Sequence, residues 1–200
     1  MTLIANFNID ALPLAGAPRR PGLSIESEKP ADYLARERLL DEAFGAARFD
    51  ETVERLREGR LPARGFALVA KEGEDLVGTV RMWHILAGEV PALLLGPLAV
   101  AKPRRSRGIG RGLMTQALFR AARAGHAAIL LVGDPPYYEP FGFSRRHTLG
   151  LSLRGPVEEA RFLGLEIKEG ALRGARGLVT AAGAPELRGD DGANDWRPAA

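Results

Sequence analysis

The most chemically informative part of the sequence is a basic loop that contains several glycines. Five cationic side chains fall within residues 102–111, and Gly108, Gly110 and Gly112 are interleaved with them. These cations are Lys102, Arg104, Arg105, Arg107 and Arg111. Glycine lets the backbone approach a bulky anion closely, and a helix N-terminus presents free N–H groups with about half a positive charge. The loop therefore predicts a phosphate or diphosphate site; the alternative is a solvated basic loop.

Two common phosphate-binding motifs fit this segment poorly. A P-loop needs Gly-Lys followed by Ser or Thr, which the sequence lacks. A dinucleotide-binding fingerprint needs G-x-G-x-x-G directly after a strand. Here the spacing is G-x-G-x-G, and seven residues separate Val100 from Gly108. We therefore expect a phosphate site of another kind.

The apolar segment before the loop carries a second signal. Residues 91–100 are almost wholly apolar, but Gly96 and Pro97 interrupt them. Proline has no N–H for a strand ladder and glycine weakens a strand, so a bulge or splay is expected there. Backbone groups at Leu98–Val100 would then be available to an extended ligand with amide groups. The alternative is an edge strand, or a strand that ends at Gly96.

The elements that must position these residues alternate between strand and helix periods. A helical stripe runs from about Gly108 to Gly125, and its members are Ile109, Leu113, Met114, Ala117, Leu118 and Ala121. Further helices are expected from Pro30, with Asp32 as candidate N-cap, and from Asp50; Pro135–Glu139 is expected to be a turn or short helix. Strands are expected at Leu23–Glu26, Gly65–Lys71, Leu76–Leu86, Pro91–Val100, Ala127–Val132, Phe141–Arg146, Phe162–Lys168 and Gly177–Ala181. This order predicts an α/β (α+β) fold with a mixed sheet covered by helices.

Composition narrows the class of protein. The chain has 200 residues, of which 46% are hydrophobic and 26% charged, as in a folded soluble domain. It has no cysteine, and its two nearest histidines, His126 and His147, are 21 residues apart, so we expect no metal site. No apolar run approaches the ~18 residues that span a bilayer, and no signal peptide is expected. We therefore expect a cytoplasmic protein with one domain at 23–182 and poorly ordered or loosely docked tails at 1–22 and 183–200.

The motifs together resemble the GCN5-related N-acetyltransferase (GNAT) superfamily. Residues 105–110 (RSRGIG) match its Q/R-x-x-G-x-G/A signature, and residues 137–143 (YYEPFGF) resemble its later aromatic box. The whole pattern is similar to the YhbS-like branch of N-acetyltransferases, over roughly residues 22–182. The resemblance implies a central mixed, mostly antiparallel sheet, splayed near residues 96–100 and flanked by helices. It also implies transfer of an acetyl group from acetyl-CoA to an amine within a ternary complex.

The resemblance assigns roles to individual residues. It implies that Tyr138 is the general acid for the departing sulfur, acting with a lowered pKa or mainly by hydrogen bonding. The implied coenzyme-binding residues are Leu98, Ala99, Val100, Arg105, Ser106, Arg107, Gly108, Ile109, Gly110 and Arg111. Gly133 and Asp134 stand where many family members carry an asparagine that contacts the coenzyme.

Several questions stay open at this point. The general base could be Glu89, His84, Glu139 or water, and the acceptor could be a small-molecule or a protein amine. Its pocket is expected around residues 33–60 and 84–92. A non-catalytic CoA-binding sensor is the alternative function. No membrane partner is expected, and neither is nucleic acid, because residues 102–111 contain no aromatic residue and the net charge is only +3. The chain could be a monomer or a homodimer.

Overall fold

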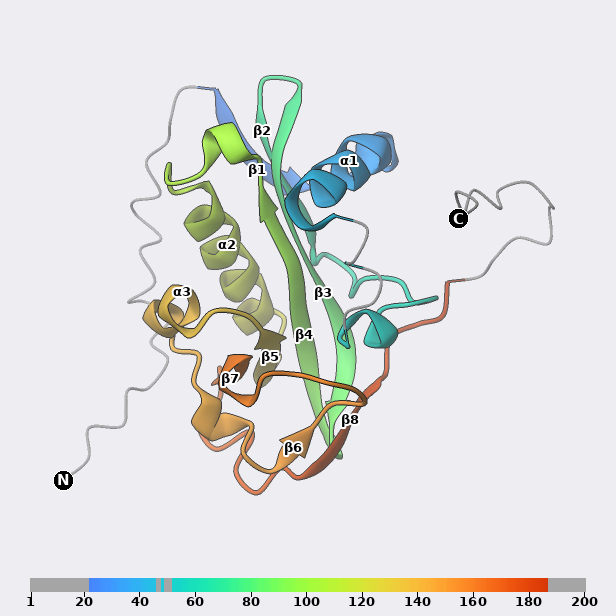
Figure 1. Cartoon of the computed structure of the whole chain (residues 1–200), viewed down its shortest axis with the longest axis vertical. Helices are drawn as coiled ribbons and strands as arrows, with labels where there is room; N and C mark the ends of the chain where they lie inside the picture. The colour runs from blue at the N-terminus through green and yellow to red at the C-terminus, as the bar shows by residue number, and fades with distance from the viewer. Residues whose placement is uncertain (1–21, 46–47, 49–51, 187–200) are drawn as a thin grey trace.

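A β-sheet with helices packed against it makes up most of the structure (Figure 1). The computed structural model describes residues 22–45, 48 and 52–186. Its strands are β1 (Leu23–Ser27), β2 (Ala67–Glu72), β3 (Asp75–Ala87), β4 (Val90–Val100), β5 (Ala128–Val132), β6 (Leu151–Ser152), β7 (Phe162–Glu166) and β8 (Gly177–Ala181). Its α-helices are α1 (Tyr33–Phe44), α2 (Ile109–Arg123) and α3 (Pro135–Tyr138). Its 3-10 turns are η2 (Pro30–Asp32), η4 (Glu54–Leu56), η5 (Lys102–Arg104), η6 (Glu139–Phe141), η7 (Arg145–His147) and η8 (Glu159–Arg161).

The sheet is mixed and mostly antiparallel. Its strand order is β1-β2-β3-β4-β5-β7, in which β4 and β5 are the parallel neighbours. β8 pairs with the end of β3 at Ile85–Ala87 and, in parallel, with β6. The predicted α/β (α+β) fold is therefore confirmed, as is the meander formed by β2, β3 and β4.

Helix α2 covers one face of the sheet with the stripe predicted from the sequence. All six members of that stripe are at most 2% exposed. They pack against sheet residues such as Leu68, Met82 and Leu93. Burial of each Ile, Leu or Met side chain of this stripe stabilises the fold by about 1.5–3 kcal/mol. The first turn of α2 is thereby held beside the end of β4.

The opposite face is covered by α1, by η4 and by the segments that lead to β6 and β8. Leu39 and Leu40 of α1 pack on Ala99, and Leu56 of η4 packs in a separate cluster that includes Leu94. Side chains from β4 therefore enter clusters on both faces of the sheet. A cleft that opens through the sheet at β4 is therefore lined by side chains from both faces.

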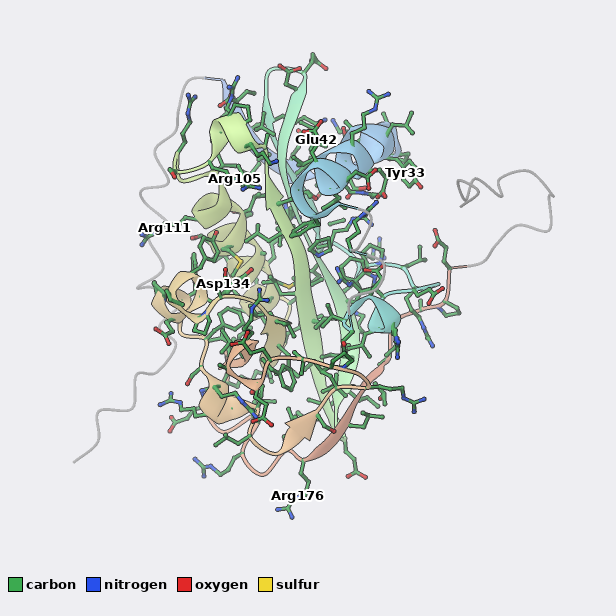
Figure 2. All side chains as sticks on the ribbon, in the orientation of Figure 1. Tyr33, Glu42, Arg105, Arg111, Asp134 and Arg176 are labelled. Atoms are coloured by element: carbon green, nitrogen blue, oxygen red, sulfur yellow. The ribbon has the colours of Figure 1, made fainter. Side chains whose placement is uncertain are left out.

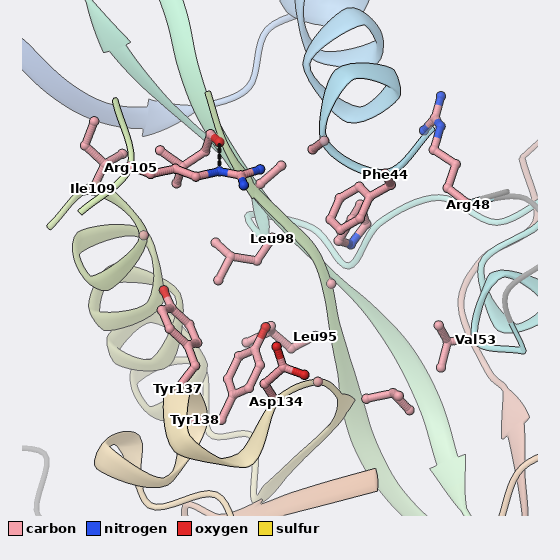
Figure 3. Close-up of a pocket in the computed structure, with 18 of the residues that line it drawn as sticks. Phe44, Arg48, Val53, Leu95, Leu98, Arg105, Ile109, Asp134, Tyr137 and Tyr138 are labelled. Carbon is pink, nitrogen blue, oxygen red and sulfur yellow. Dashed lines mark hydrogen bonds between the residues drawn. The ribbon is translucent and has the colours of Figure 1, made fainter. Parts of the chain in front are cut away.

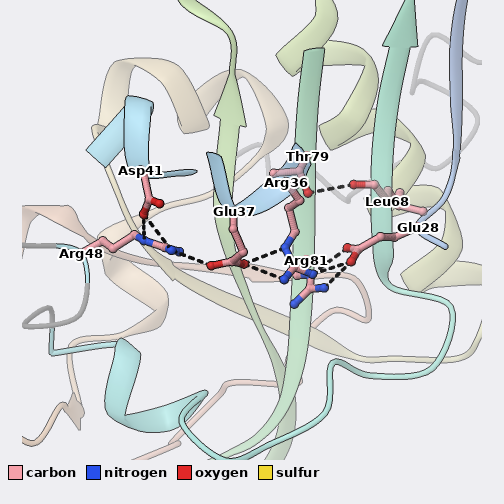
Figure 4. Close-up of polar contacts among 8 residues, drawn as sticks. All are labelled: Glu28, Arg36, Glu37, Asp41, Arg48, Leu68, Thr79 and Arg81. Atoms are coloured by element: carbon pink, nitrogen blue, oxygen red, sulfur yellow. Dashed lines mark hydrogen bonds and ion pairs between the residues drawn. The ribbon is translucent and has the colours of Figure 1, made fainter. Parts of the chain in front are cut away.

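A chain of ion pairs connects α1 to the sheet (Figure 4). Buried Arg36 donates to Glu28, and its Nη2 lies 2.6 Å from Glu37 Oε1. Arg81 of β3 donates to the same Glu28, with its Nε 2.9 Å from Oε2. Burial raises the pKa of Glu28, although Arg36 opposes that effect. Burial alone would also raise the pKa of Glu37, but hydrogen bonds from Arg48 and Arg36 outweigh it and lower that pKa.

The predicted disturbance at Gly96-Pro97 is a β-bulge. Met82 pairs with Leu95 and Val80 with Leu98, so three steps along β4 match two along β3. The Gly96-Pro97 peptide bond is cis. An extra residue reverses which positions face each side of a strand. Leu95 before the bulge and Leu98 after it consequently both pack toward the α2 side of the sheet.

The bulge coincides with a splay between β4 and β5. These strands pair only at Leu93–Ile129 and Leu94–Leu130. Beyond Leu95, β4 continues along β3 while β5 leaves its other edge. The splay expected near residues 96–100 is therefore present.

One expected strand is absent from the structure, and one short strand was not expected. The strand predicted at Phe141–Arg146 is wrong: the segment forms η6 and η7, with one isolated bridge from Ser144 to Gly164. Pro140 has no N–H, and Gly142 has a positive φ of 91°, so the chain turns instead of extending. The two-residue strand β6 was not predicted.

The early helices also differ in detail. Asp32 stands at the N-cap position of α1, but its side chain does not cap that helix. Its carboxylate accepts the Lys29 N–H at 2.9 Å and lies 2.7 Å from Lys71 Nζ, which ties the start of α1 to β2. The predicted helix start at Asp50 lies outside the described residues; η4 is a single 3-10 turn.

The ends of the expected domain are partly described. Residues 1–21 and 187–200 lie outside the described part of the chain. Residues 183–186, expected to start the C-terminal tail, run along residues 59–61: the Leu61 N–H donates to Ala184 O and the Glu186 N–H to Gly59 O, both at 2.9 Å. Within the described ranges, every helix is too short or too polar to cross a membrane.

Candidate active site

A cleft of about 550 Å³ lies where β4 and β5 separate (Figure 3). Residues 94–100 of β4 run through it, and the first turn of α2 and the two tyrosines of α3 line one side. Residues 132–134 at the end of β5, residues from the end of α1 to η4, residues 104–106 and Arg161 also line it. In Figure 3, Tyr137 and Tyr138 lie on one side of β4, and Phe44 and Val53 lie on the other.

Ten of the eleven residues predicted for the site line this cleft. They are Tyr138, Leu98, Ala99, Val100, Arg105, Ser106, Gly108, Ile109, Gly110 and Arg111. Arg107 is exposed and does not line it. In Figure 2, Arg105, Arg111 and Asp134 lie in the part of the molecule where Figure 1 labels α2 and α3.

The splayed edge of β4 presents backbone groups to the cleft. The Ala101 N–H donates to Val77 O on β3, and the two edges of a strand alternate. The backbone groups of Ala99 therefore face β3, whereas those of Leu98 and Val100 face the open edge. On that edge, Arg105 Nε donates to Val100 O at 3.1 Å. The N–H and C=O groups of Ala99 are thus turned away from the open edge of the cleft. The Val100 carbonyl faces that edge but already accepts a hydrogen bond from Arg105.

The loop into α2 forms an anion-binding corner. The N–H groups of residues 106–111 donate to no acceptor within the described chain, whereas the Gly112 N–H donates to Gly108 O. Gly108, at the N-cap, has a φ of 80°, a conformation that side chains rarely adopt. Free amides and the positive end of α2 therefore meet at one corner of the cleft.

The cations of the loop are divided between the cleft and its surroundings. Arg104, Arg105 and Arg111 line the cleft, whereas Lys102 does not. Arg104 is already paired, with its Nε 2.6 Å from Glu72 Oε2. Arg105 and Arg111 are thus the loop cations best placed for a bound anion.

Two adjacent tyrosines pack against glycines that leave room for them. A Cβ atom at Gly110 would lie 2.6 Å from the Tyr137 hydroxyl, and one at Gly133 would collide with the Tyr138 ring. The two tyrosine rings meet edge to face at 4.9 Å. The Gly110 backbone is therefore in close contact with α3, which places the aromatic box beside the anion-binding corner.

Burial strongly raises the pKa of Tyr138. The neighbouring Tyr137 and Asp134 raise this pKa further, and Arg161 lowers it only in part. A lowered pKa for Tyr138, one of the two expectations above, is therefore wrong. The phenol stays protonated at neutral pH and can act as a hydrogen-bond donor.

None of the three side chains proposed as general base lines the cleft. Glu89 and Glu139 are exposed elsewhere, and the His84 ring packs 5.4 Å from that of His126, beyond the C-terminal end of α2. Among the residues that the structure describes, the carboxylates that do line it are Glu54 and Asp134. Glu54 was missed because no motif marks it: only the packing of η4 brings it to the cleft.

Part of the region where the acceptor pocket is expected lines the cleft. Of the described residues between positions 43 and 57, six line the cleft: Ala43, Phe44, Arg48, Val53, Glu54 and Arg57. Residues 84–92 do not, because the turn between β3 and β4 lies at the far end of these strands. No group of three or more His, Asp or Glu side chains arranged to hold a metal ion occurs in the described chain.

Comparisons with known proteins agree with this geometry. Residues 33–143 match the sequence profile of the Acetyltransferase (GNAT) family. The chain is 31% identical over 157 residues to the protein named Uncharacterized N-acetyltransferase YhbS from Escherichia coli strain K12, covering 78% of this chain and 93% of that one.

Solved structures show the same similarity. The crystal structure of YhbS from Escherichia coli in complex with CoA aligns with a TM-score of 0.68 and 31% identity, over 80% of this chain and 89% of that one. A GNAT family acetyltransferase from Brucella melitensis in complex with acetyl-CoA aligns with a TM-score of 0.56 and 26% identity, over 72% and 87%. With its splayed sheet, free helix-terminal amides and matching sequence, the chain belongs to the GNAT family of acetyltransferases.

Proposed function

We propose that the protein transfers the acetyl group of acetyl-CoA to a primary amine by direct attack within a ternary complex. The observation that carries the proposal is the corner where free amides of residues 106–111 meet the open edge of β4. The CoA and acetyl-CoA complexes of the two structural relatives support it.

The anion-binding corner suits the diphosphate of the coenzyme. Amides and a helix N-terminus bind phosphate oxygens without any sequence-specific side chain. Arg105 and Arg111 supply charge-assisted hydrogen bonds in addition. Arg105 would then keep its contact to Val100 O or exchange it for a phosphate oxygen, because one guanidinium offers several donors.

The open edge of β4 suits the pantetheine arm and the thioester. The backbone groups of Leu98 and Val100 face this edge, and they can pair with the amides of an extended ligand as a further strand would. Fixed N–H groups near the bulge can stabilise the oxyanion that forms as the amine attacks. Holding both reactants in line supplies much of the rate acceleration.

Tyr138 serves the leaving sulfur as a hydrogen-bond donor. A free thiol has a pKa of ~8.5, well below the ~10 of an ordinary phenol. Since burial raises the Tyr138 pKa further, full proton transfer from the phenol to a thiolate is unfavourable. The phenol instead stabilises negative charge on sulfur while remaining protonated, and the sulfur takes its proton from the reacting amine.

A thermal-shift and turnover experiment tests this function. CoA at ~100 times its Kd should stabilise the protein by about 2.7 kcal/mol, whereas DNA or RNA should not. Acetyl-CoA with a panel of primary amines should release free thiol, which is measured directly. Binding of CoA without turnover of any amine would favour a CoA sensor. Absence of CoA binding would contradict both functions.

A further inference from the structure

A carboxylate at the end of the cleft opposite the tyrosines has no role in the proposed function so far. Glu54 belongs to η4 and lines the cleft. The other cleft-lining carboxylate of the described chain, Asp134, has a side chain that is 77% exposed and pairs with Arg161 at 3.1 Å. The Glu54 side chain is only 29% exposed. Glu54 is therefore the more shielded of the two anions.

The two clusters beside β4 place Glu54 and Tyr138 on opposite faces of the sheet. Tyr138 packs with the cluster on the α2 face. Val53 and Leu56, which flank Glu54, pack with the cluster on the other face. One cleft reaches both groups because β4 and β5 are splayed between them. A thioester lying in the splay would therefore offer its sulfur to one face and its carbonyl carbon to the other.

The segment that carries Glu54 is anchored on both sides. Thr52 Oγ1 donates to Pro156 O at 2.5 Å, and Arg55 Nη1 donates to Arg154 O at 3.4 Å. Leu56 is 8% exposed. Glu54 is thus held on a fixed support, as a substrate-binding group must be.

Arg57 keeps Glu54 in place within this segment. Its Nη2 lies 3.3 Å from Glu54 Oε2, and its guanidinium lies 5.6 Å from the centre of the Trp83 ring. Its Nε also donates to Val53 O at 3.4 Å. Arg57 is only 8% exposed, so its conformation is restricted by packing. We regard Arg57 as a positioning residue for the carboxylate.

We propose that Glu54 binds the ammonium group of the acceptor and takes the proton that it must lose before attack. The acceptor class is accordingly a primary aliphatic amine, which is an ammonium ion at neutral pH. This inference rests on the proposed acetyl transfer and adds to it the acceptor class and the base.

The proton and electron balance of the step is complete. The ammonium gives one proton to the Glu54 carboxylate, and the neutral nitrogen forms a bond to the thioester carbonyl carbon. The C–S bond breaks, and its electron pair goes to sulfur. The extra proton on the attacking nitrogen passes to that sulfur, which leaves as a thiol. Glu54 then returns its proton to water, so one proton is released for each amide formed.

Two pairs of CoA thioethers test the ammonium site without knowledge of the acceptor. S-(2-aminoethyl)-CoA and S-(3-aminopropyl)-CoA carry an ammonium where S-propyl-CoA and S-butyl-CoA carry a methyl group. We expect one or both amines to bind the wild-type protein at least about tenfold more tightly than the matched neutral compound at pH 7, as for a charge-assisted hydrogen bond. Calorimetric titration measures each Kd.

Variants then assign this preference to a residue. E54Q should reduce it to less than about twofold while leaving the Kd of the neutral compounds unchanged, which also shows that the variant is folded. E58Q is the matched control, because Glu58 is exposed, lies in the same segment and does not line the cleft; it should retain the full preference.

Other outcomes overturn the inference in distinguishable ways. No preference in the wild type, with both kinds of compound bound, would refute the ammonium site and leave CoA binding intact. If the E54Q variant still prefers the amines, Glu54 does not bind the ammonium group. If D134N also abolishes the preference, Asp134 binds it instead. Failure of all four compounds to bind would contradict the proposed function itself. If E54Q is unfolded, the D134N variant still decides the question. Loss of the preference for the amines in D134N would overturn the inference, and a preference that D134N retains would support it.

Discussion

Tyr138 shows how the surroundings of one side chain decide which chemistry it can perform. Its ring fills the space left by Gly133 and meets the Phe143 ring at 5.9 Å. The same packing raises its pKa, so the phenol is a poor proton donor but a stable hydrogen-bond donor. The sequence motif predicted where this tyrosine stands, but not this shift, because desolvation depends on residues that are distant in sequence.

Removal of the Tyr138 hydroxyl tests its hydrogen bond to the leaving sulfur. Y138F should lower kcat by about 100-fold, the lower end of the range for loss of one donor that stabilises transition-state charge, and should leave the Kd for CoA within twofold. Because the Tyr138 pKa is raised, its phenol stays protonated at neutral and mildly alkaline pH, and kcat should not fall between pH 7 and pH 9.5. Steady-state kinetics against pH measure both effects. A kcat of Y138F equal to that of the wild type, or a wild-type kcat that declines from pH 7 to pH 9.5, would contradict the role of Tyr138 as hydrogen-bond donor to the sulfur.

A second residue-scale prediction separates two arginines of the same loop. R105M should weaken CoA binding by about tenfold, or about 1.4 kcal/mol, through loss of a charge-assisted hydrogen bond. R107M removes the same charge from an exposed side chain outside the cleft, and should change the Kd by less than about twofold. Calorimetry at fixed ionic strength compares them. Equal losses for both variants would mean that only the overall charge of the loop matters.

Among the elements, those with a clear period were predictable, whereas those made by tertiary packing were not. The stripe of α2 and the Gly96-Pro97 interruption of β4 predicted the helix and the bulge that frame the anion-binding corner. The strand expected at Phe141–Arg146 is absent, because Pro140 and Gly142 redirect the chain. Glu54 lies on a single 3-10 turn that has no sequence period, so its place in the cleft could not be foreseen.

A prediction at the scale of the element tests what fixes α1 against the sheet. R36M removes the buried guanidinium that joins Glu28 to Glu37, and leaves these carboxylates with fewer partners. Breaking a buried ion pair from one side costs about 3–5 kcal/mol. Urea unfolding should show that R36M lowers the free energy of unfolding by that amount. R38M should lower it by less than about 0.5 kcal/mol, since Arg38 is exposed on the same helix. Similar stabilities of the two variants would show that the network is dispensable.

At the scale of the whole molecule, two histidines link stability to pH. Burial lowers the pKa of His126, and nearby His84 lowers it further. Burial also lowers the pKa of His147; Glu166 opposes this effect and Arg146 adds to it. Below the ordinary value of about 6.5, the unfolded chain therefore binds protons that the folded protein does not. Stability consequently falls as the pH drops below that value.

The lowered pKa values of His126 and His147 should make the stability of the folded protein depend on pH. The free energy of unfolding should decrease from pH 7 to pH 5, and the double variant H126Q/H147Q should show a smaller decrease over the same interval. Urea titrations at several pH values measure both slopes. A variant as sensitive to acid as the wild type would place the effect on other groups.

In the complex that we propose, acetyl-CoA lies along the splayed edge of β4 with its diphosphate at the N-terminus of α2. The most direct measurement is a crystal structure with a stable acetyl-CoA analogue in which a methylene group separates sulfur and carbonyl. We expect the diphosphate oxygens to accept hydrogen bonds from amides of residues 106–111, the pantetheine arm to lie against Leu98 and Val100, and the sulfur to lie near the Tyr138 hydroxyl. An analogue bound elsewhere, or one whose diphosphate makes no contact with those amides, would contradict it.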